Sequence, residues 1–178
     1  MRIIAGSRKG ARIFPPKGDT RPTGDRVREA AFNLIGPVED MSVLDLFAGS
    51  GAMGLEALSR GAATAVFVES DRGAQRAIER NLDKLGLTGA RVVRSDARRA
   101  LAAEAAAGSR YDLVLVDPPY RMFDFLQPTL AAYVPALLAE EGLVLVETDR
   151  RTEPELPLTQ RTSRTYGSAR LTVFEGLA

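Results

Sequence analysis

The sequence predicts an α/β fold built on a doubly wound, mostly parallel sheet. Two observations lead to this prediction. Beyond Pro37, short apolar runs alternate with amphipathic stretches, which is typical of strands joined by helical crossovers. The apolar runs are continuous, as expected of parallel strands covered by helices on both faces. The crossovers should be right-handed.

The first residues predict a short β-hairpin. Two brief runs, residues 2–5 and 11–14, flank a glycine-bounded basic segment at residues 6–10. Glycines at both ends of a short polar segment indicate a turn between two short strands. We therefore expect a hairpin with a basic tip.

A helix is expected next, from Asp25 to the Gly36-Pro37 pair. Its apolar positions recur at i, i+3, i+4, i+7 and i+8, the spacing of one buried helical face. Arg26 and Arg28 lie off this stripe, so we expect both side chains to be exposed.

The remaining elements follow from the same patterns. Strands are expected at residues 43–47, 65–69, 91–94, 111–117 and 143–147. Helices are expected at residues 52–59, 71–85, 97–106 and 124–138. Residues 162–166 and 170–175 flank Gly167-Ser168 and predict a closing antiparallel hairpin.

Composition narrows the possible chemistry. The 178 residues include no Cys, His or Trp, which excludes a thiolate nucleophile, an imidazole base and a Cys/His zinc site. The 45% hydrophobic and 26% charged content is that of an ordinary globular protein. No apolar run approaches the roughly 20 residues that span a bilayer. We expect a cytoplasmic single domain, residues 1–178, with no metal and no membrane contact.

Charge is distributed unevenly along the chain. Residues 1–28 hold eight Lys or Arg and two acids, a net charge of +6, and the remainder holds 16 basic and 21 acidic residues, a net charge of −5. Segregated charge of this kind favours a basic surface for a polyanion.

The end of the first strand carries a glycine pattern. Gly49-x-Gly51-x-x-Gly54 matches the dinucleotide fingerprint, and Glu69 follows Gly49 by 20 residues, where a ribose-binding acid belongs. By itself this pattern also allows a nicotinamide dehydrogenase.

Two further acids change that interpretation. Asp45, inside the first strand, would repel a pyrophosphate but suits a ligand with an ammonium or sulfonium group. S-adenosylmethionine has both groups and no phosphate. Asp96, after the third strand, is placed to accept a hydrogen bond from an adenine amine, although it is equally suited to capping the next helix.

The fourth strand ends in the most specific motif, Asp117-Pro118-Pro119-Tyr120. Two prolines remove two backbone donors and restrict the turn, which leaves carbonyl groups as acceptors. An exocyclic amine could donate to the Asp117 carboxylate and the Pro118 carbonyl while Tyr120 stacks on its ring. Such orientation favours methylation of the nitrogen without a strong general base.

These motifs resemble the class I S-adenosylmethionine-dependent methyltransferases, and more closely the RsmD family, which methylates the exocyclic N2 of one guanine in bacterial 16S ribosomal RNA. The resemblance covers nearly the whole chain. It rests on residues 2–6, 9–10, 21–23, 25–30, 32–33, 45–51, 54–62, 69, 81–82, 117–120 and 166–167.

The resemblance implies a Rossmann-like sheet of seven strands in the order 3-2-1-4-5-7-6, with the last strand antiparallel. It implies a catalytic turn made of Asp117, Pro118, Pro119 and Tyr120. Cofactor contacts are implied for Asp45, Phe47, Ala48, Gly49, Ser50, Gly51, Glu69, Ser70, Asp96 and Ala97. RNA contacts are expected for Arg8, Lys9, Arg12, Arg21, Arg26 and Arg28.

The expected partner is 16S rRNA, within an assembling or assembled 30S subunit, bound by a monomer. Residues 1–36 would be an RNA-contacting extension and residues 37–178 the catalytic core. The same Asp-Pro-Pro-Tyr turn would also suit an adenine-N6 or a protein glutamine-amide methyltransferase. A nicotinamide dehydrogenase and a non-catalytic RNA-binding protein are the alternatives from other classes.

Overall fold

A seven-stranded sheet forms the middle layer of the protein, whose computed structural model describes residues 1–15 and 24–176. The strand order is β3-β2-β1-β4-β5-β7-β6, and β7 is antiparallel to both of its neighbours, which confirms the predicted topology. The strands are β1 (Ser42–Leu46), β2 (Thr64–Glu69), β3 (Ala90–Arg94), β4 (Tyr111–Val116), β5 (Leu138–Asp149), β6 (Thr159–Tyr166) and β7 (Ala169–Glu175).

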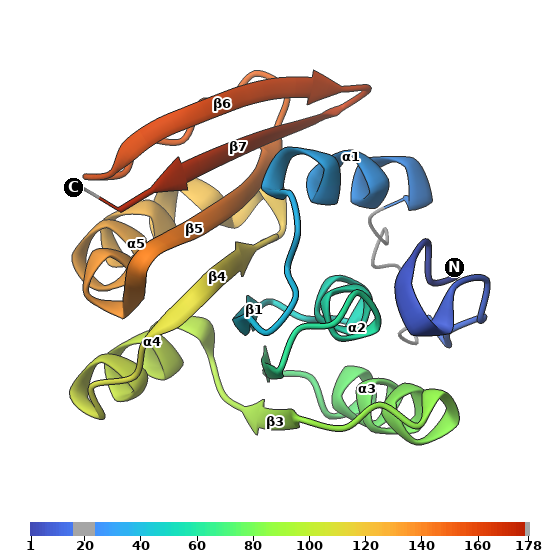
Figure 1. The fold of residues 1–178 in the computed structure, drawn as a ribbon. Coiled ribbons are helices and arrows are strands. Elements are labelled where there is room, and N and C mark those ends of the chain that lie inside the picture. Colours follow the sequence, from blue (N-terminus) through green and yellow to red (C-terminus); the bar gives the residue numbers. More distant parts are fainter. Residues whose placement is uncertain (16–23, 177–178) are drawn as a thin grey trace.

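Helices cover both faces of the sheet (Figure 1). On one face lie α1 (Asp25–Ile35), α2 (Ala52–Ser59) and α3 (Arg72–Leu85), and on the other α4 (Ala97–Ala106) and α5 (Phe123–Leu137). Neighbouring strand residues point to opposite faces, so Val43 packs with the first group and Leu44 with the second. This double cover explains why the central strands are continuously apolar.

The element boundaries differ from the predictions by a few residues. The largest difference is in β5, which begins at Leu138, directly after α5, rather than at residue 143. Its pairing with β4 shifts register between Tyr111 and Leu113, and Glu141 has a positive φ of 60°. The Ala-Glu-Glu-Gly segment thus bends within the strand instead of forming a separate turn.

Residues 1–15, called the N-terminal arm below, turn back on themselves as predicted, but the two expected strands are reduced to a single antiparallel bridge between Arg2 and Arg12. The Ile3 amide donates to the Ala11 carbonyl at 2.9 Å, and the Gly10 amide to the Ile3 carbonyl at 2.8 Å. The tip is a short 3-10 turn, Gly6–Arg8. At Gly6 φ is +80° and a Cβ would overlap the Ser59 carbonyl oxygen, so only glycine allows the arm to pack this closely on α2.

A buried carboxylate, Glu56 of α2, fastens the arm to the core. Its two oxygens accept hydrogen bonds from the amides of Ile4 and Ala5, at 2.8 and 3.0 Å. They also lie 3.6 Å from Arg28 Nε and 2.7 Å from Arg60 Nε. Two cations and two amides therefore offset the cost of burying this charge.

The expectation that Arg28 is exposed is wrong. Its side chain is fully buried, with Nη2 donating to the Arg2 carbonyl and, at 2.9 Å, to Asp25. Arg28 lies outside the apolar stripe of α1, but the arm and α2 pack against that side of the helix as well. Arg28 thus joins α1 to the arm and is removed from the expected RNA contacts, whereas Arg26 is exposed as predicted.

Candidate active site

The loop after β1 has an unusual backbone. Phe47, Gly49 and Gly51 have φ values of 61°, 57° and 80°. Glycine adopts this left-handed region easily, but for a bulky residue such as Phe47 it is strained, and strain of this kind concentrates at functional sites. The loop side chains of Ala48 and Ser50 are buried, so the backbone forms much of its surface.

Glu69, at the end of β2, holds this loop in place. One carboxylate oxygen accepts from the Gly49 amide at 2.8 Å, and the other accepts from the Asp71 amide at 2.8 Å. A Cβ on Gly49 would meet only the Phe47 carbonyl oxygen, at 4.0 Å. The loop therefore leaves space at Gly49 where a ligand can approach the backbone.

Asp45 is buried beside the loop. Its Oδ2 accepts from the Gly54 amide at 2.9 Å. Burial raises the pKa of Asp45 to about 8, the Gly54 bond opposes this rise, and the charges of Asp117 and Glu69 add to it. Two carboxylates from neighbouring strand ends thus act on Asp45, and a bound cation would favour its charged form.

Asn81 of α3 is a site residue whose role the residue patterns did not predict. Its side chain is fully buried. The amide oxygen accepts from the Phe14 amide at 2.7 Å, and Nδ2 donates to the carbonyls of Phe14 and Ser50 at 3.0 and 3.1 Å. One side chain therefore links the arm to the loop after β1.

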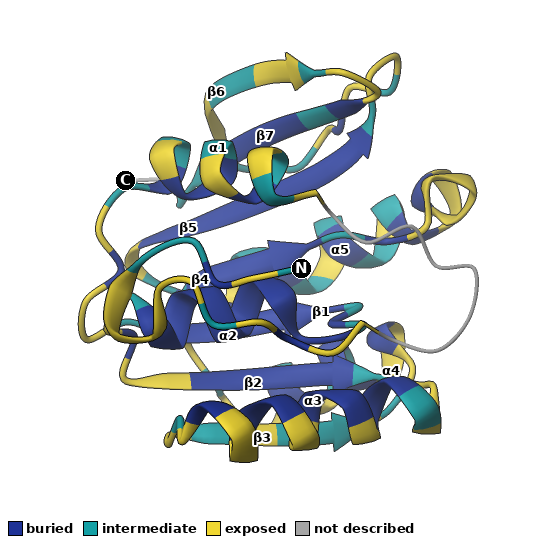
Figure 2. Ribbon diagram, turned by 90° about the vertical axis from the view of Figure 1, so that its right-hand side faces the viewer, coloured by how far each residue is buried: buried dark blue, intermediate teal, exposed yellow. Residues whose placement is uncertain are grey.

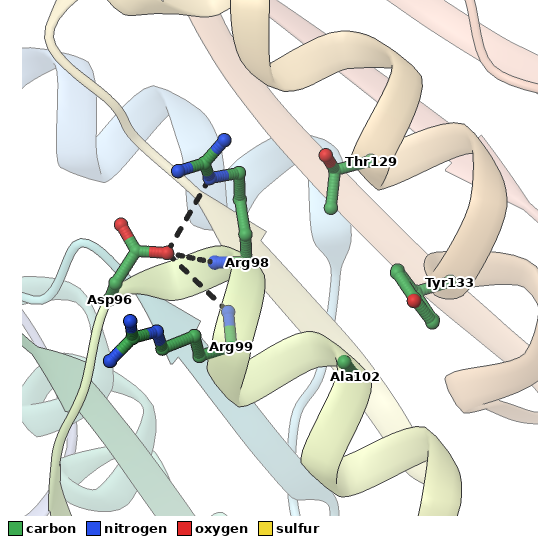
Figure 3. Close-up of a pocket in the computed structure, with 6 residues that line it drawn as sticks. All are labelled: Asp96, Arg98, Arg99, Ala102, Thr129 and Tyr133. Carbon is green, nitrogen blue, oxygen red and sulfur yellow. Dashed lines mark hydrogen bonds and ion pairs between the residues drawn. The ribbon is translucent and has the colours of Figure 1, made fainter.

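Asp96 acts as the N-cap of α4, the alternative that the sequence left open. Its Oδ1 accepts from the amides of Arg98 and Arg99 at 3.0 and 3.4 Å (Figure 3). Its side chain is 46% exposed, which leaves it accessible to a ligand as well. Ser70 is exposed and Ala97 is buried.

A cavity of about 520 Å³ lies beside Asp96, between α4 and α5 (Figure 3). Arg98, Arg99 and Ala102 line it from α4, and Thr129 and Tyr133 from α5. Neither the loop after β1 nor the turn after β4 contributes to its wall, so this cavity lies next to the candidate cofactor site rather than within it.

The turn after β4 places its motif at the same edge of the sheet. Asp117 is half-buried, Pro118 is buried, and Pro119 and Tyr120 are exposed. The Pro119 carbonyl accepts from the Met122 amide at 2.8 Å, which fixes the path of the chain into α5. Val116 of β4 pairs with Leu46 of β1, so the turn and the loop after β1 leave neighbouring strands at the same edge of the sheet.

Glu147 of β5 completes this turn, and no motif pointed to it. Its side chain is buried and accepts a hydrogen bond from the Tyr120 hydroxyl at 3.2 Å. The available signal was an acid near the end of the fifth strand, at the edge where Asp117 ends the fourth. The sequence does not reveal the hydrogen bond to Tyr120, and in the sequence alone Glu147 is simply an acid that follows an apolar run.

Exposed apolar side chains follow the turn. Tyr120, Met122 and Phe125 are 39%, 36% and 66% exposed, and the Arg98 guanidinium lies 4.7 Å from the centre of the Phe125 ring. Exposed aromatic and apolar groups beside a pocket suit a flat heterocycle, which gains from stacking on them.

Besides the buried Arg28, the predicted RNA-contacting residues fall into three groups. Lys9, Arg12 and Arg26 are exposed. Arg8 is exposed too, but its guanidinium donates to the carbonyls of Leu85 and Gly86 at the end of α3. Arg21 lies outside the described residues.

Neither a metal site nor a membrane-spanning helix is found in the described part of the chain. Within residues 1–15 and 24–176, no group of three or more Asp or Glu side chains is arranged to hold a metal ion. None of the helices described there is long and apolar enough to cross a bilayer.

Comparison with known proteins gives consistent matches. A family model described as "Conserved hypothetical protein 95" matches residues 1–175. Ribosomal RNA small subunit methyltransferase D of Escherichia coli K12 is 43% identical over 152 residues, which cover 84% of this chain and 75% of that protein.

Solved structures share the fold. A hypothetical protein of Thermus thermophilus matches with a TM-score of 0.85 and 36% identity, over 97% of this chain and 98% of the other. The 16S rRNA N2 G1207 methyltransferase RsmC of T. thermophilus, solved with AdoMet and guanosine, matches with a TM-score of 0.72 and 24% identity, over 90% of this chain and 44% of that one. At that identity the second match shows the fold alone.

Proposed function

Because the chain belongs to the ribosomal RNA small subunit methyltransferase D (RsmD) family, we propose that it methylates the exocyclic N2 amine of a guanine in 16S rRNA. It is an S-adenosylmethionine-dependent methyltransferase. This membership excludes the nicotinamide dehydrogenase that the glycine pattern alone allowed. The observation that carries the proposal is that β1, β2 and β4 are adjacent parallel strands, so the loop after Asp45, the acid Glu69 and the Asp117–Tyr120 turn lie at one edge of the sheet.

The residues present fit the cofactor. When bound, S-adenosylmethionine supplies an electrophilic methyl group. Its cationic part suits the acidic group around Asp45, whose neighbours Asp117 and Glu69 are also carboxylates, and the space at Gly49 allows close approach to the backbone. We assign cofactor contacts to Asp45, Phe47, Ala48, Gly49, Ser50, Gly51, Glu69, Ser70, Asp96 and Ala97.

The turn after β4 supplies the acceptors that orient the target amine. The Asp117 carboxylate accepts one N–H of the amino group and the Pro118 carbonyl accepts the other. The nitrogen lone pair is then directed away from both. Orientation of this kind lowers the barrier by removing unproductive geometries. The methylated nitrogen loses a proton, which Asp117 or water takes up.

The Tyr120 ring provides a stacking surface for the guanine. Its hydroxyl is held by Glu147, so the ring is ordered before the base arrives. A base inside helical RNA must leave its stack to reach this turn, at a cost of a few kcal/mol that is smallest in loops and for unpaired bases.

Residues 1–36 form, in this proposal, the RNA-contacting extension of a catalytic core at residues 37–178. Lys9, Arg12 and Arg26 supply exposed positive charge, and we retain Arg8 and Arg21 as candidates. We propose a monomer acting in the cytoplasm on 16S rRNA assembled in, or assembling into, the 30S subunit.

Methylation of defined substrates tests the function. Unmethylated 30S particles and naked 16S rRNA are each incubated with the protein and S-adenosylmethionine, and the modified nucleoside is mapped by mass spectrometry. We expect N2-methylguanine at one position. N6-methyladenine, or no methyl transfer to either substrate, would contradict the proposal, and the preferred substrate would identify the biological form of the RNA.

A further inference from the structure

Helix α3 carries a row of exposed basic side chains. Arg72, Arg76, Arg80 and Lys84, called the α3 basic stripe below, recur every four residues and are all exposed. The inner face of the helix packs on the sheet through Ala74, Ala77, Ile78, Leu82 and Leu85. Figure 2 shows α3 along one side of the molecule, with its inner face buried and its outer face exposed.

The helix itself gains little from this arrangement. Like charges four residues apart repel one another, and Arg72 lies at the first turn, where the helix dipole disfavours a cation. Glu79 and Asp83 are also exposed on α3. Within residues 1–15 and 24–176, however, no side chain of the stripe forms an ion pair with a carboxylate. The positive charge is therefore available to a partner.

The N-terminal arm joins this stripe at its far end. The ring of Phe14 lies 4.2 Å from the Arg80 guanidinium and 4.7 Å from Lys84 Nζ. Lys84 also donates to the Arg12 carbonyl at 2.6 Å. The exposed cations of the arm and of α3 thus lie on one continuous surface, although they come from segments about 70 residues apart.

The other end of the stripe reaches the candidate active site. Arg72 directly follows Asp71, whose amide donates to Glu69, and the other oxygen of the same Glu69 carboxylate holds the Gly49 amide of the loop after β1. From Arg72 to Lys84 the helix rises about 18 Å, which is long enough to follow several phosphates of an RNA strand. A polyanion lying along this surface would lead directly to the catalytic edge of the sheet.

We infer that the α3 basic stripe, together with the exposed cations of the arm, binds the phosphate backbone of the RNA substrate and guides it to the active site. This inference rests on the proposed function for the identity of the RNA. It assigns RNA contacts to residues in the part of the chain whose net charge is negative. The inference depends on the regular four-residue spacing of these cations along the exposed side of α3, rather than on how many there are.

Arg72 and Arg76 provide the cleanest test, because it is Arg80 and Lys84 that hold the arm, through Phe14 and the Arg12 carbonyl. Binding of in vitro transcribed 16S rRNA, and separately of unmethylated 30S particles, is measured across a salt series for wild type, R72Q/R76Q and the charge-retaining R72K/R76K. The matched control is R110Q/R161Q, which removes two exposed charges, one from the loop before β4 and one from the edge strand β6. Thermal stability and S-adenosylmethionine affinity are measured for each variant.

We expect R72Q/R76Q to lose about tenfold in RNA affinity near physiological salt, and its log–log salt slope to fall by about one per lost phosphate contact. R72K/R76K and R110Q/R161Q should bind RNA as wild type does. Cofactor affinity should be unchanged, and the melting temperature should not fall, because removing the charge of Arg72 relieves its unfavourable interaction with the helix dipole. A merely structural role of these side chains would instead lower the melting temperature together with RNA affinity.

Wild-type RNA affinity in R72Q/R76Q would overturn the inference. So would a loss of affinity confined to 30S particles, because the stripe would then bind a ribosomal protein. Failure of the proposed function is distinguishable: the wild-type protein would bind RNA with the expected salt dependence and the stripe variant would lose that binding, but no guanine would be methylated.

Discussion

The Tyr120 hydroxyl donates a hydrogen bond to Glu147 Oε1 at 3.2 Å. This bond ties the turn after β4 to the buried end of β5, across 27 residues of sequence. The Tyr120 ring is therefore held at its hydroxyl while remaining 39% exposed. We infer that Glu147 is a positioning residue, acting on the base through Tyr120.

Replacing Tyr120 with phenylalanine should separate positioning from stacking. Y120F keeps the ring but loses a hydrogen bond worth about 1 kcal/mol, so we expect kcat to fall about fivefold with little change in KM for RNA. Y120A removes the stacking surface as well and should also raise KM. Equal kinetics for Y120F and Y120A would show that the ring does not stack on the base.

Asp117 is expected to orient the target amine. D117A should retain S-adenosylmethionine binding but lose methyl transfer by at least about 100-fold, since misorientation by about 1 Å can cost that much. D117N, which keeps one acceptor oxygen, should lose less. Single-turnover methylation and calorimetric cofactor binding check these outcomes. Near-normal turnover in D117A would refute the role assigned to the turn.

The raised pKa of Asp45 predicts a pH-dependent stability. The folded protein keeps the Asp45 proton up to a pKa of about 8, whereas the pKa of an unperturbed Asp carboxyl is 3.8. Between those values the folded state binds more protons than the unfolded chain, so this group's stabilising contribution falls as pH rises from about 4 to about 8. Above pH 8 its contribution should no longer change.

Denaturant unfolding between pH 4 and pH 9 measures this effect. D45N is the matched variant, because an amide oxygen can still accept from the Gly54 amide while the titrating group is gone. The difference in unfolding free energy between wild type and D45N should shrink or reverse as pH rises. A constant difference across this range would show that Asp45 does not titrate there.

The same group should couple cofactor binding to pH. A cationic ligand beside Asp45 favours the ionised carboxylate, so S-adenosylmethionine affinity should rise with pH between 6 and 7.5, by up to about tenfold per unit. Equilibrium titration of wild type and D45N gives the two profiles. A wild-type profile as flat as that of D45N would argue against Asp45 as a cofactor contact.

Asn81 should affect both stability and the cofactor loop. N81A leaves the Phe14 amide and the Ser50 carbonyl without this partner, which should cost about 1–3 kcal/mol of unfolding free energy and weaken S-adenosylmethionine binding. N81D keeps an acceptor for the Phe14 amide but turns oxygen toward two carbonyls, so it should be no better than N81A. Wild-type stability in N81D would mean that these bonds contribute little.

Local patterns predicted most of the fold. The helices at residues 52–59 and 97–106 match the structure residue for residue, because apolar spacing, and in the second helix the capping residue Asp96, depend only on residues close together in the chain. The strands were found for the same reason, and their ends shifted where pairing continued past the apolar run, as in β5. The strand order came from the family resemblance, since periodicity carries no information about neighbours.

The candidate site was only partly predictable. The loop after β1 and the Asp117–Tyr120 turn are contiguous motifs whose chemistry depends on residues next to one another. Glu147 and Asn81 act through partners 27 and 67 residues away, so no local pattern identified their roles. Asp96 remained ambiguous because the same carboxylate suits a helix cap and a ligand contact, and in the structure its Oδ1 caps α4.

The sequence by itself determined the alternation of strands and helices, the glycine loop, the Asp117–Tyr120 turn and the absence of Cys and His chemistry, because each depends on residue type and short-range spacing. Only the tertiary structure decided where charge lies. It buried Arg28 against Glu56 and Asp25, and it joined the arm to the basic face of α3 through Phe14. Charge counted along the chain reports only how many cations a segment has, whereas a binding surface depends on which cations remain exposed and which distant segments pack beside them.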